Sequence, residues 1–156
     1  MDIDRKLISL LLVQKTMSAL DQRISNFLKN HSVLTMATSF GDEPYCANLF
    51  YAFLPEDNCF VVTSDMNTKH IRNISHNIFV AGSIVDACNL PVAKGIQFQG
   101  VISEPSQVLA EKAKKAYSSL FLFSHGMNTT LWVIDLTFVK YTDSTLGFGK
   151  KLIWKK

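Results

Sequence analysis

The sequence predicts a mainly β fold with peripheral helices, arranged as a small closed or half-closed antiparallel barrel. Four or five short strand-like runs follow one another with brief turns, interrupted by one small helical crossover and one long helix. Antiparallel strands tolerate such turns, whereas a parallel sheet needs a helix after each strand. At 156 residues, 47% of them hydrophobic, the chain fits one domain with one core.

The first residues are expected to be an extension of this domain. Residues 1–16 contain the apolar run 7–13, but Asp2 and Asp4 remove the positive charge that a signal peptide carries at its start. The run is also shorter than the roughly 20 apolar residues that span a bilayer. We therefore expect an N-terminal extension over 1–16 and the domain over 17–156, with Met17 as a candidate start.

The first helix is predicted over about 19–30. Ser18 and Asp21 have the spacing of a capping box, which satisfies free N–H groups at the start of a helix. Apolar residues then recur at helical spacing, at Leu20, Ile24, Phe27 and Leu28.

A β-hairpin should follow this helix. Residues 33–40 and 45–53 are strand-like, and Gly41 and Asp42 between them are typical turn residues. In the second run both alternating faces are mostly apolar. We expect such a strand to be central, or to lie between the core and a partner subunit.

The rest of the chain continues the pattern of short strands. The predicted elements are a turn at 55–58, a strand at 59–63, a short helix at 67–75, a strand at 78–85, a loop at 86–94, a strand at 95–103, a long helix within 103–121 with Pro105 in its first turn, a loop at 124–130, a strand at 131–142 and a tail.

Composition excludes some partners. The formal net charge is only +3, and no block of five or more basic residues would follow a nucleic-acid backbone. The run 111–115, EKAKK, is typical of a solvated helix face. We expect no nucleic-acid partner and no membrane partner.

The cysteines indicate the compartment. Cys46, Cys59 and Cys88 are odd in number, form no C-x-x-C pair and have apolar neighbours, which is typical of buried free thiols. A cytoplasmic protein is therefore expected.

Motifs for unaided catalysis do not occur. The run GFGKK at 147–151 is no P-loop, because that motif needs a glycine where Ser144 stands and a hydroxyl where Lys151 stands. No G-x-S-x-G is present, Cys46 lies within a strand, and the carboxylates are scattered. No metal site is expected, because the histidines lack ligand spacing at positions 31, 70, 76 and 125.

The stretch FVVTSDMNTKHIRNISH at 60–76 is the best candidate for a binding site. Thr63 and Ser64 end a strand, and Lys69 stands where a short helix begins. Hydroxyls, free N–H groups and a positive charge together can bind a phosphate. The alternative is that the hydroxyls only cap the turn and the lysine is solvated. With no catalytic group of its own, such a protein would most simply bind a reactive cofactor.

Four stretches in order resemble a known family: 33–53, 59–77, 96–103 and 141–154. They resemble the flavin-binding split-barrel superfamily related to pyridoxamine 5'-phosphate oxidase. The ending LGFGKKLIW is similar to that of an uncharacterised bacterial subgroup. The resemblance implies a six-stranded antiparallel split β-barrel, a homodimer and a flavin mononucleotide (FMN) site shared between the subunits.

The resemblance also assigns residues to the FMN. It places the flavin phosphate on Lys69, the isoalloxazine edge along one stretch of strand, and a side chain from a neighbouring strand beside the flavin. The assigned residues are Lys69 with Thr63, Ser64, Thr68 and His70 at the phosphate, Ala47, Asn48 and Leu49 at the ring, and Gln97 from the neighbouring strand.

The chain also departs from the oxidase. Ala47 stands where the oxidase has an arginine that holds the phosphate, so one charge-assisted contact is missing. The C-terminal Arg and His that bind the oxidase's substrate have no counterpart, so pyridoxamine phosphate oxidation is not expected. Lys150, Lys151 or Trp154 could replace the lost contacts, and packing at a dimer interface explains Trp154 equally well.

Three functions remain open. The first is an FMN-dependent oxidoreductase or flavin reductase, with a small-molecule substrate and a nicotinamide as candidate reductant. The second is a non-catalytic ligand-binding protein whose flavin site is degenerate. The third is a haem-handling protein on the same barrel, for which no axial ligand can be identified.

Overall fold

A computed structural model describes residues 19–89, 92–124, 126, 128–147 and 150–156 of the chain. The expected extension over 1–16, Met17 and Ser18 lie outside the described residues, as does His125.

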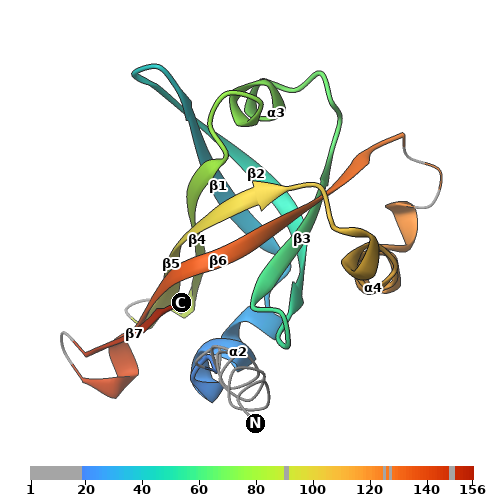
Figure 1. Ribbon diagram of the computed structural model, residues 1–156. Helices are drawn as coiled ribbons and strands as arrows, with labels where there is room; N and C mark the ends of the chain where they lie inside the picture. The colour runs from blue at the N-terminus through green and yellow to red at the C-terminus, as the bar shows by residue number, and fades with distance from the viewer. Residues whose placement is uncertain (1–18, 90–91, 125, 127, 148–149) are drawn as a thin grey trace, which may run out of the picture.

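Within the described residues, seven antiparallel strands form one sheet that closes into a ring (Figure 1). Their order is β3-β2-β1-β4-β5-β6-β7, and an additional pairing of β3 with β6 closes the ring. The predicted mainly β antiparallel barrel is therefore confirmed. The strands are β1 Val33–Phe40, β2 Glu43–Leu54, β3 Cys59–Ser64, β4 Phe79–Asn89, β5 Val92–Ser103, β6 Thr130–Asp143 and β7 Lys151–Lys155.

The ring is split along one edge of β6. Residues 130–135 of β6 pair with β3, and residues 138–142 pair with β7 on the chain's return. β3 and β7 thus lie one after the other along the same edge of β6. The sequence predicted a tail where β7 lies, so β7 is a strand that the prediction lacked. Trp154 of β7 is buried in the core of the barrel. This burial contradicts both roles expected of it, stacking on a flavin and packing at a dimer interface.

In the described part of the chain three α-helices surround the sheet, and Figure 1 shows α2 and α3 at opposite ends of the barrel and α4 at its side. Because its side chains pack against β2, β3 and β6, α4 covers the outside of the ring there. None of the described helices is long and apolar enough to cross a membrane. The helices are α2 Gln22–Lys29, α3 Lys69–Ile74 and α4 Gln107–Leu120, with 3-10 turns η1 Leu122–Ser124 and η2 Ser144–Leu146.

Some predicted boundaries are corrected. α2 begins at Gln22 rather than near 19, because Asp21 is the N-cap and its carboxylate accepts the backbone N–H of Arg23 at 2.9 Å. Hydrogen bonds from Arg23 lower the pKa of Asp21 to about 2. The predicted loop 86–94 is mostly strand, because the β4–β5 ladder continues through the pairs Asp86–Lys94 and Asn89–Val92.

Alternation along β3 divides the apolar residues into two clusters. Phe60 and Val62 point into the barrel, whereas Cys59 and Val61 point outward beneath α4. Burial raises the pKa of the Cys59 thiol to about 12, as expected for an inert buried cysteine. The expectation is wrong for Cys46, which is exposed on β2, and the Cys88 side chain lies outside the described part.

The outward face of the sheet away from α4 carries exposed apolar side chains. Phe79, Val85 and Ile153 are 68%, 67% and 60% exposed, on β4 and β7. Val33 on β1 is also exposed, and so is Phe50 on β2, although the Phe50 ring lies nearer α4, 5.2 Å from that of its C-cap residue Phe121. Cys46 lies on this same face, which explains why its thiol is not buried.

Candidate functional site

The end of β3 and the start of α3 form a corner in which three polar side chains meet. The Ser64 hydroxyl lies 2.7 Å from Nε2 of His70 and 3.2 Å from the Thr68 hydroxyl. The Thr68 hydroxyl lies 3.2 Å from the same nitrogen and donates to the backbone oxygen of Asp65 at 2.9 Å. Ser64 and His70 are buried, so this cluster, here called the β3–α3 corner, fixes the turn.

Burial lowers the pKa of His70 below its usual 6.5, so the ring is neutral at pH 7. A hydroxyl beside a neutral imidazole is also the pairing of a serine nucleophile and its base. Ser64 is only 6% exposed, however, and a substrate cannot reach its hydroxyl. The pair therefore serves to hold the chain and not to attack a substrate.

Acid should destabilise the protein through His70. Unfolding releases the ring to a pKa of about 6.5, so below that pH the unfolded state binds more protons and the free energy of unfolding falls. The loss begins as the pH drops through 6.5, ends below the folded pKa, and has a slope of at most about 1.4 kcal/mol per pH unit. Urea unfolding of wild type and His70→Gln at pH 7.5, 6.5 and 5.5 measures it; parallel curves would contradict the prediction.

Lys69 lies at the surface of this corner. Its ammonium is 3.4 Å from the Glu43 carboxylate and 5.7 Å from the centre of the Tyr45 ring, both on β2. The Lys69 side chain is 43% exposed and that of Glu43 is 82% exposed, and an ion pair so exposed contributes about 0–1 kcal/mol. A phosphate could therefore replace Glu43 as the partner of Lys69 at little cost.

β2 has a free edge beside this corner. Residues 43–50 of β2 pair with β1, but only residues 51–54 pair with β3. Among the described residues, no strand pairs with the β3-side edge of β2 over 43–50. Backbone groups of successive strand residues point alternately to the two edges. The N–H of Tyr51 bonds to Ser32 on the β1 side, so Leu49 and Ala47 also point toward β1, and the N–H and C=O of Asn48 point to the free edge, where a ligand could bind them.

Side chains of that stretch point to different sides. Asn48 lies on the outer face, where its Oδ1 accepts from the Thr35 hydroxyl at 2.8 Å. Leu49 packs against the core inside the barrel. A ligand along this edge would thus meet the backbone and Asn48 rather than a row of three side chains.

Two predicted residues do not join the corner. Thr63 points away from Ser64, because adjacent strand residues face opposite sides, and its hydroxyl donates to Tyr117 of α4 at 3.0 Å. Gln97 lies on β5, and β1 and β4 separate it from β2, so it is not on a neighbouring strand. Three strand spacings place it roughly 14 Å from Asn48 along the outer face.

Glu43 and Tyr45 are the residues of this site that the sequence did not reveal. They lie more than 20 residues before Lys69 in the sequence, so no local motif could link them to it. In the described part of the chain no group of His, Cys, Asp and Glu side chains is placed to hold a metal ion.

Solved structures share this fold. A heme binding protein from Mycobacterium smegmatis matches 80% of this chain and 52% of its own, with TM-score 0.68 and 20% identity. A FAD-binding protein from Mesorhizobium loti matches 80% and 95%, with TM-score 0.65 and 19% identity. A Clostridium acetobutylicum protein of the pyridoxinephosphate oxidase family matches 87% and 96%, with TM-score 0.63 and 13% identity. The expected split-barrel fold is confirmed.

Sequence relatives are closer. No protein-family model matches the chain. The UPF0306 protein plu4501 of Photorhabdus laumondii is 35% identical over 136 residues, which cover 86% of this chain and 95% of the relative. The UPF0306 protein YhbP of Escherichia coli is 31% identical over 134 residues, which cover 85% and 96%. The chain therefore belongs to the UPF0306 family.

Proposed function

We propose that this protein binds FMN between the free edge of β2 and the β3–α3 corner and acts as a flavin-dependent oxidoreductase or flavin reductase. The observation that carries the proposal is the free backbone edge at Asn48, on the strand whose Glu43 and Tyr45 contact Lys69. A structural neighbour is named as a FAD-binding protein, which supports a flavin on this barrel.

The described side chains fit a flavin phosphate at one end. Lys69 would supply the positive charge, and the Thr68 hydroxyl lies one residue before it at the surface of the corner. Ser64 and His70 are already bonded to one another, so their role is to hold Thr68 and Lys69 in place. At the ring end Asn48 would bind through its backbone groups, with its side chain on the outer face and Ala47 and Leu49 on either side of it.

Bound flavin would supply the redox chemistry by exchanging hydride or electrons with a small-molecule substrate or a nicotinamide. The chain supplies position and polarity. Ala47 offers no charge to the phosphate, so Lys69 would make the charge-assisted contact in place of the missing arginine, and removing it should have a large effect.

A homodimer would complete the site. The exposed apolar side chains of the outer face, among them Phe79, Val85 and Ile153, form a surface that a second copy could bury. Gln97 and Asn48 lie on this face. Gln97, too far from the corner of its own subunit, would then reach the flavin of the other one.

The test is FMN binding by wild type and Lys69→Ala. We expect the dissociation constant to rise at least tenfold, or about 1.4 kcal/mol, because the variant loses a charged hydrogen bond to the phosphate. Absorbance and quenching of flavin fluorescence measure it. Lys29→Ala, which removes an exposed lysine of α2, is the matched control and should bind like wild type. A wild type that takes up no flavin, or a Lys69→Ala that binds equally well, would overturn the proposal.

Reduction of the bound flavin distinguishes an oxidoreductase from a non-catalytic binding protein. Reduction of the bound flavin by NADH or NADPH, followed under anaerobic conditions by loss of visible absorbance, would support the oxidoreductase. Flavin that binds tightly but accepts no electrons from either nicotinamide would favour the non-catalytic binding protein. A cytoplasmic location stays a prediction.

Haem is the second candidate ligand, favoured by the heme binding protein among the structural neighbours. His70 is buried and bonded, and Nδ1 of His31 lies 2.7 Å from the backbone oxygen of Phe27. His76 is exposed and its ring lies 4.2 Å from that of Phe40, so it is the histidine to test as an axial ligand. Haem titration of wild type and His76→Ala, followed at the Soret band, decides between the two ligands.

A further inference from the structure

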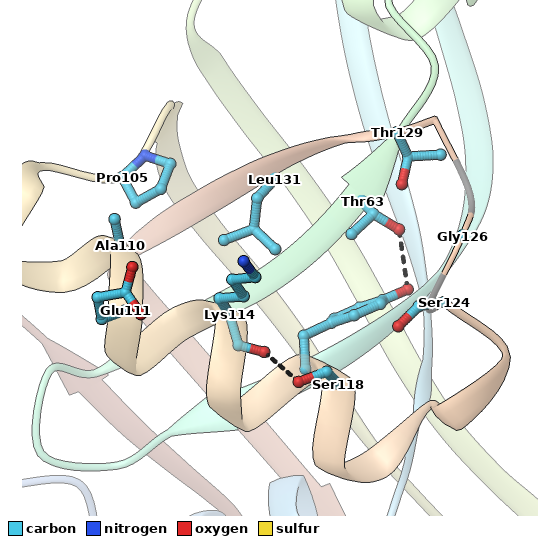
Figure 2. A pocket seen from close by; sticks show the side chains of 11 residues that line it. Thr63, Pro105, Ala110, Glu111, Lys114, Ser118, Ser124, Gly126, Thr129 and Leu131 are labelled. Atoms are coloured by element: carbon cyan, nitrogen blue, oxygen red, sulfur yellow. Dashed lines mark hydrogen bonds between the residues drawn. The ribbon is translucent and has the colours of Figure 1, made fainter.

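A cavity of about 450 Å³ lies between α4 and the ends of β3 and β6, on the outer side of the sheet (Figure 2). Its apolar lining includes Pro105, Ala110 and Leu131, and its polar lining includes Lys114, Tyr117 and Thr63. Volumes of roughly 300–1,000 Å³ with a mostly apolar wall and a few polar groups are typical of small-molecule sites.

The floor of the cavity carries an available hydrogen-bond donor. Tyr117 is only 4% exposed, and its oxygen accepts the hydrogen of the Thr63 hydroxyl at 3.0 Å. Among the described residues, no acceptor takes the hydrogen of Tyr117 itself. A buried hydroxyl with a free hydrogen gains a bond when a ligand supplies the acceptor.

A positive charge stands beside this donor. In Figure 2 the Lys114 side chain extends from α4 toward Leu131, and Tyr117, three residues further along the same helix, lines the same cavity. Its ammonium has no acidic partner in the described part of the chain, although Lys112 on the same helix pairs with Glu56 at 2.7 Å and Asp57 at 2.5 Å. The charge of Lys114 is therefore available to a ligand.

We propose that this cavity binds a small organic anion with an apolar body, of the class of aromatic monocarboxylates. The carboxylate would accept from Lys114 and from the Tyr117 hydroxyl, and the ring would lie against Leu131 and Pro105. Glu111 also lines the cavity. Its negative charge opposes a doubly charged phosphate more than a singly charged carboxylate.

This site is separate from the proposed flavin site. Thr63 faces the cavity, whereas Ser64, the next residue on β3, faces the β3–α3 corner inside the barrel. The strand itself divides them. The inference therefore does not rest on flavin binding, and its test needs no flavin.

The probes are benzoate and its uncharged isostere benzamide, each titrated into full-length protein and followed by ¹⁵N–¹H NMR. We expect benzoate to shift the amide signals of Thr63, Tyr117 and Leu131, with a dissociation constant of about 1 mM, as suits so small a probe. Benzamide should bind at least fivefold more weakly.

Lys114→Met keeps the aliphatic stem and removes the charge. It should weaken benzoate at least fivefold and leave benzamide unchanged. Lys115→Met, on an exposed neighbour that does not line the cavity, is the matched control and should bind both probes like wild type. Equal binding of the two probes by wild type, shifts that map to another surface, or unchanged benzoate binding by Lys114→Met would each overturn the proposal.

Discussion

Replacing Phe60 with alanine is expected to lower the free energy of unfolding by about 3–5 kcal/mol, the cost of an emptied aromatic site in a close-packed core. Phe60 is fully buried at the centre of the barrel. Its ring centre lies 4.8 Å from that of Tyr51 and 5.1 Å from that of Phe98, so strands β2, β3 and β5 meet on this one side chain. Urea unfolding followed by circular dichroism gives the value.

Val108→Ala is the control for this change. Val108 is 93% exposed on α4, and its truncation should alter stability by no more than about 0.5 kcal/mol. The slope of the free energy against urea should stay the same in all three proteins, which shows that the comparison concerns stability alone. A loss below about 2 kcal/mol for Phe60→Ala would mean that the barrel interior can collapse onto the vacant site.

The positions of most strands along the sequence could be predicted, because the pattern of apolar residues in each strand reflects its own burial. β1 runs over Val33–Phe40, as predicted, and its neighbours begin or end within a few residues of the expected positions. The turn at Gly41 was also legible, since the chain there adopts a φ of 57° that favours glycine. Such signals lie within a few residues of the element that they predict.

β7 was not predicted, because it forms through pairing with a strand elsewhere in the sheet and not through its own sequence pattern. It is five residues long and carries lysines at both ends. Only its pairing with residues 138–142 of β6 and the burial of Trp154 make it a strand. A solvated tail and a short edge strand of this composition look alike in sequence.

The candidate site was predictable in part for a similar reason. The resemblance placed Ser64, Thr68, Lys69 and His70 together, and they do form one corner. Thr63 could have been separated from them by strand periodicity alone, because neighbours on a strand face opposite sides. Gln97 could not be separated from the site in this way, because its distance from β2 depends on the strand order of the whole sheet.

Gly82 illustrates a position that only the folded sheet explains. It stands in the middle of the joint between β1 and β4, which has three registered pairs: Thr35–Ser83, Met36–Gly82 and Ala37–Ala81. A Cβ atom on Gly82 would lie 2.3 Å from the backbone oxygen of Thr35 and 2.4 Å from the Phe98 ring. Real Cβ atoms do not come so close to backbone, so the two strands must move apart.

Gly82→Ala is therefore expected to cost about 3 kcal/mol, the upper part of the usual range for overpacking. An ordinary strand glycine would instead gain stability from alanine, because alanine has less conformational freedom to lose on folding. The sign of the change thus tests the close approach. For a chain of this length the loss corresponds to a fall in Tm of roughly 6–12 °C, measured by thermal unfolding.

Gly95→Ala on β5 is the matched control. Its nearest contact would be the backbone oxygen of Ile84 at 3.2 Å, which a shift of a few tenths of an ångström relieves. We expect its Tm to stay within roughly 4 °C of wild type. If both variants lose the same amount, the loss reflects any added methyl group in this sheet. If only Gly82→Ala has a lower Tm, the short pairing between β1 and β4 is a place where the ring depends on the absence of a side chain.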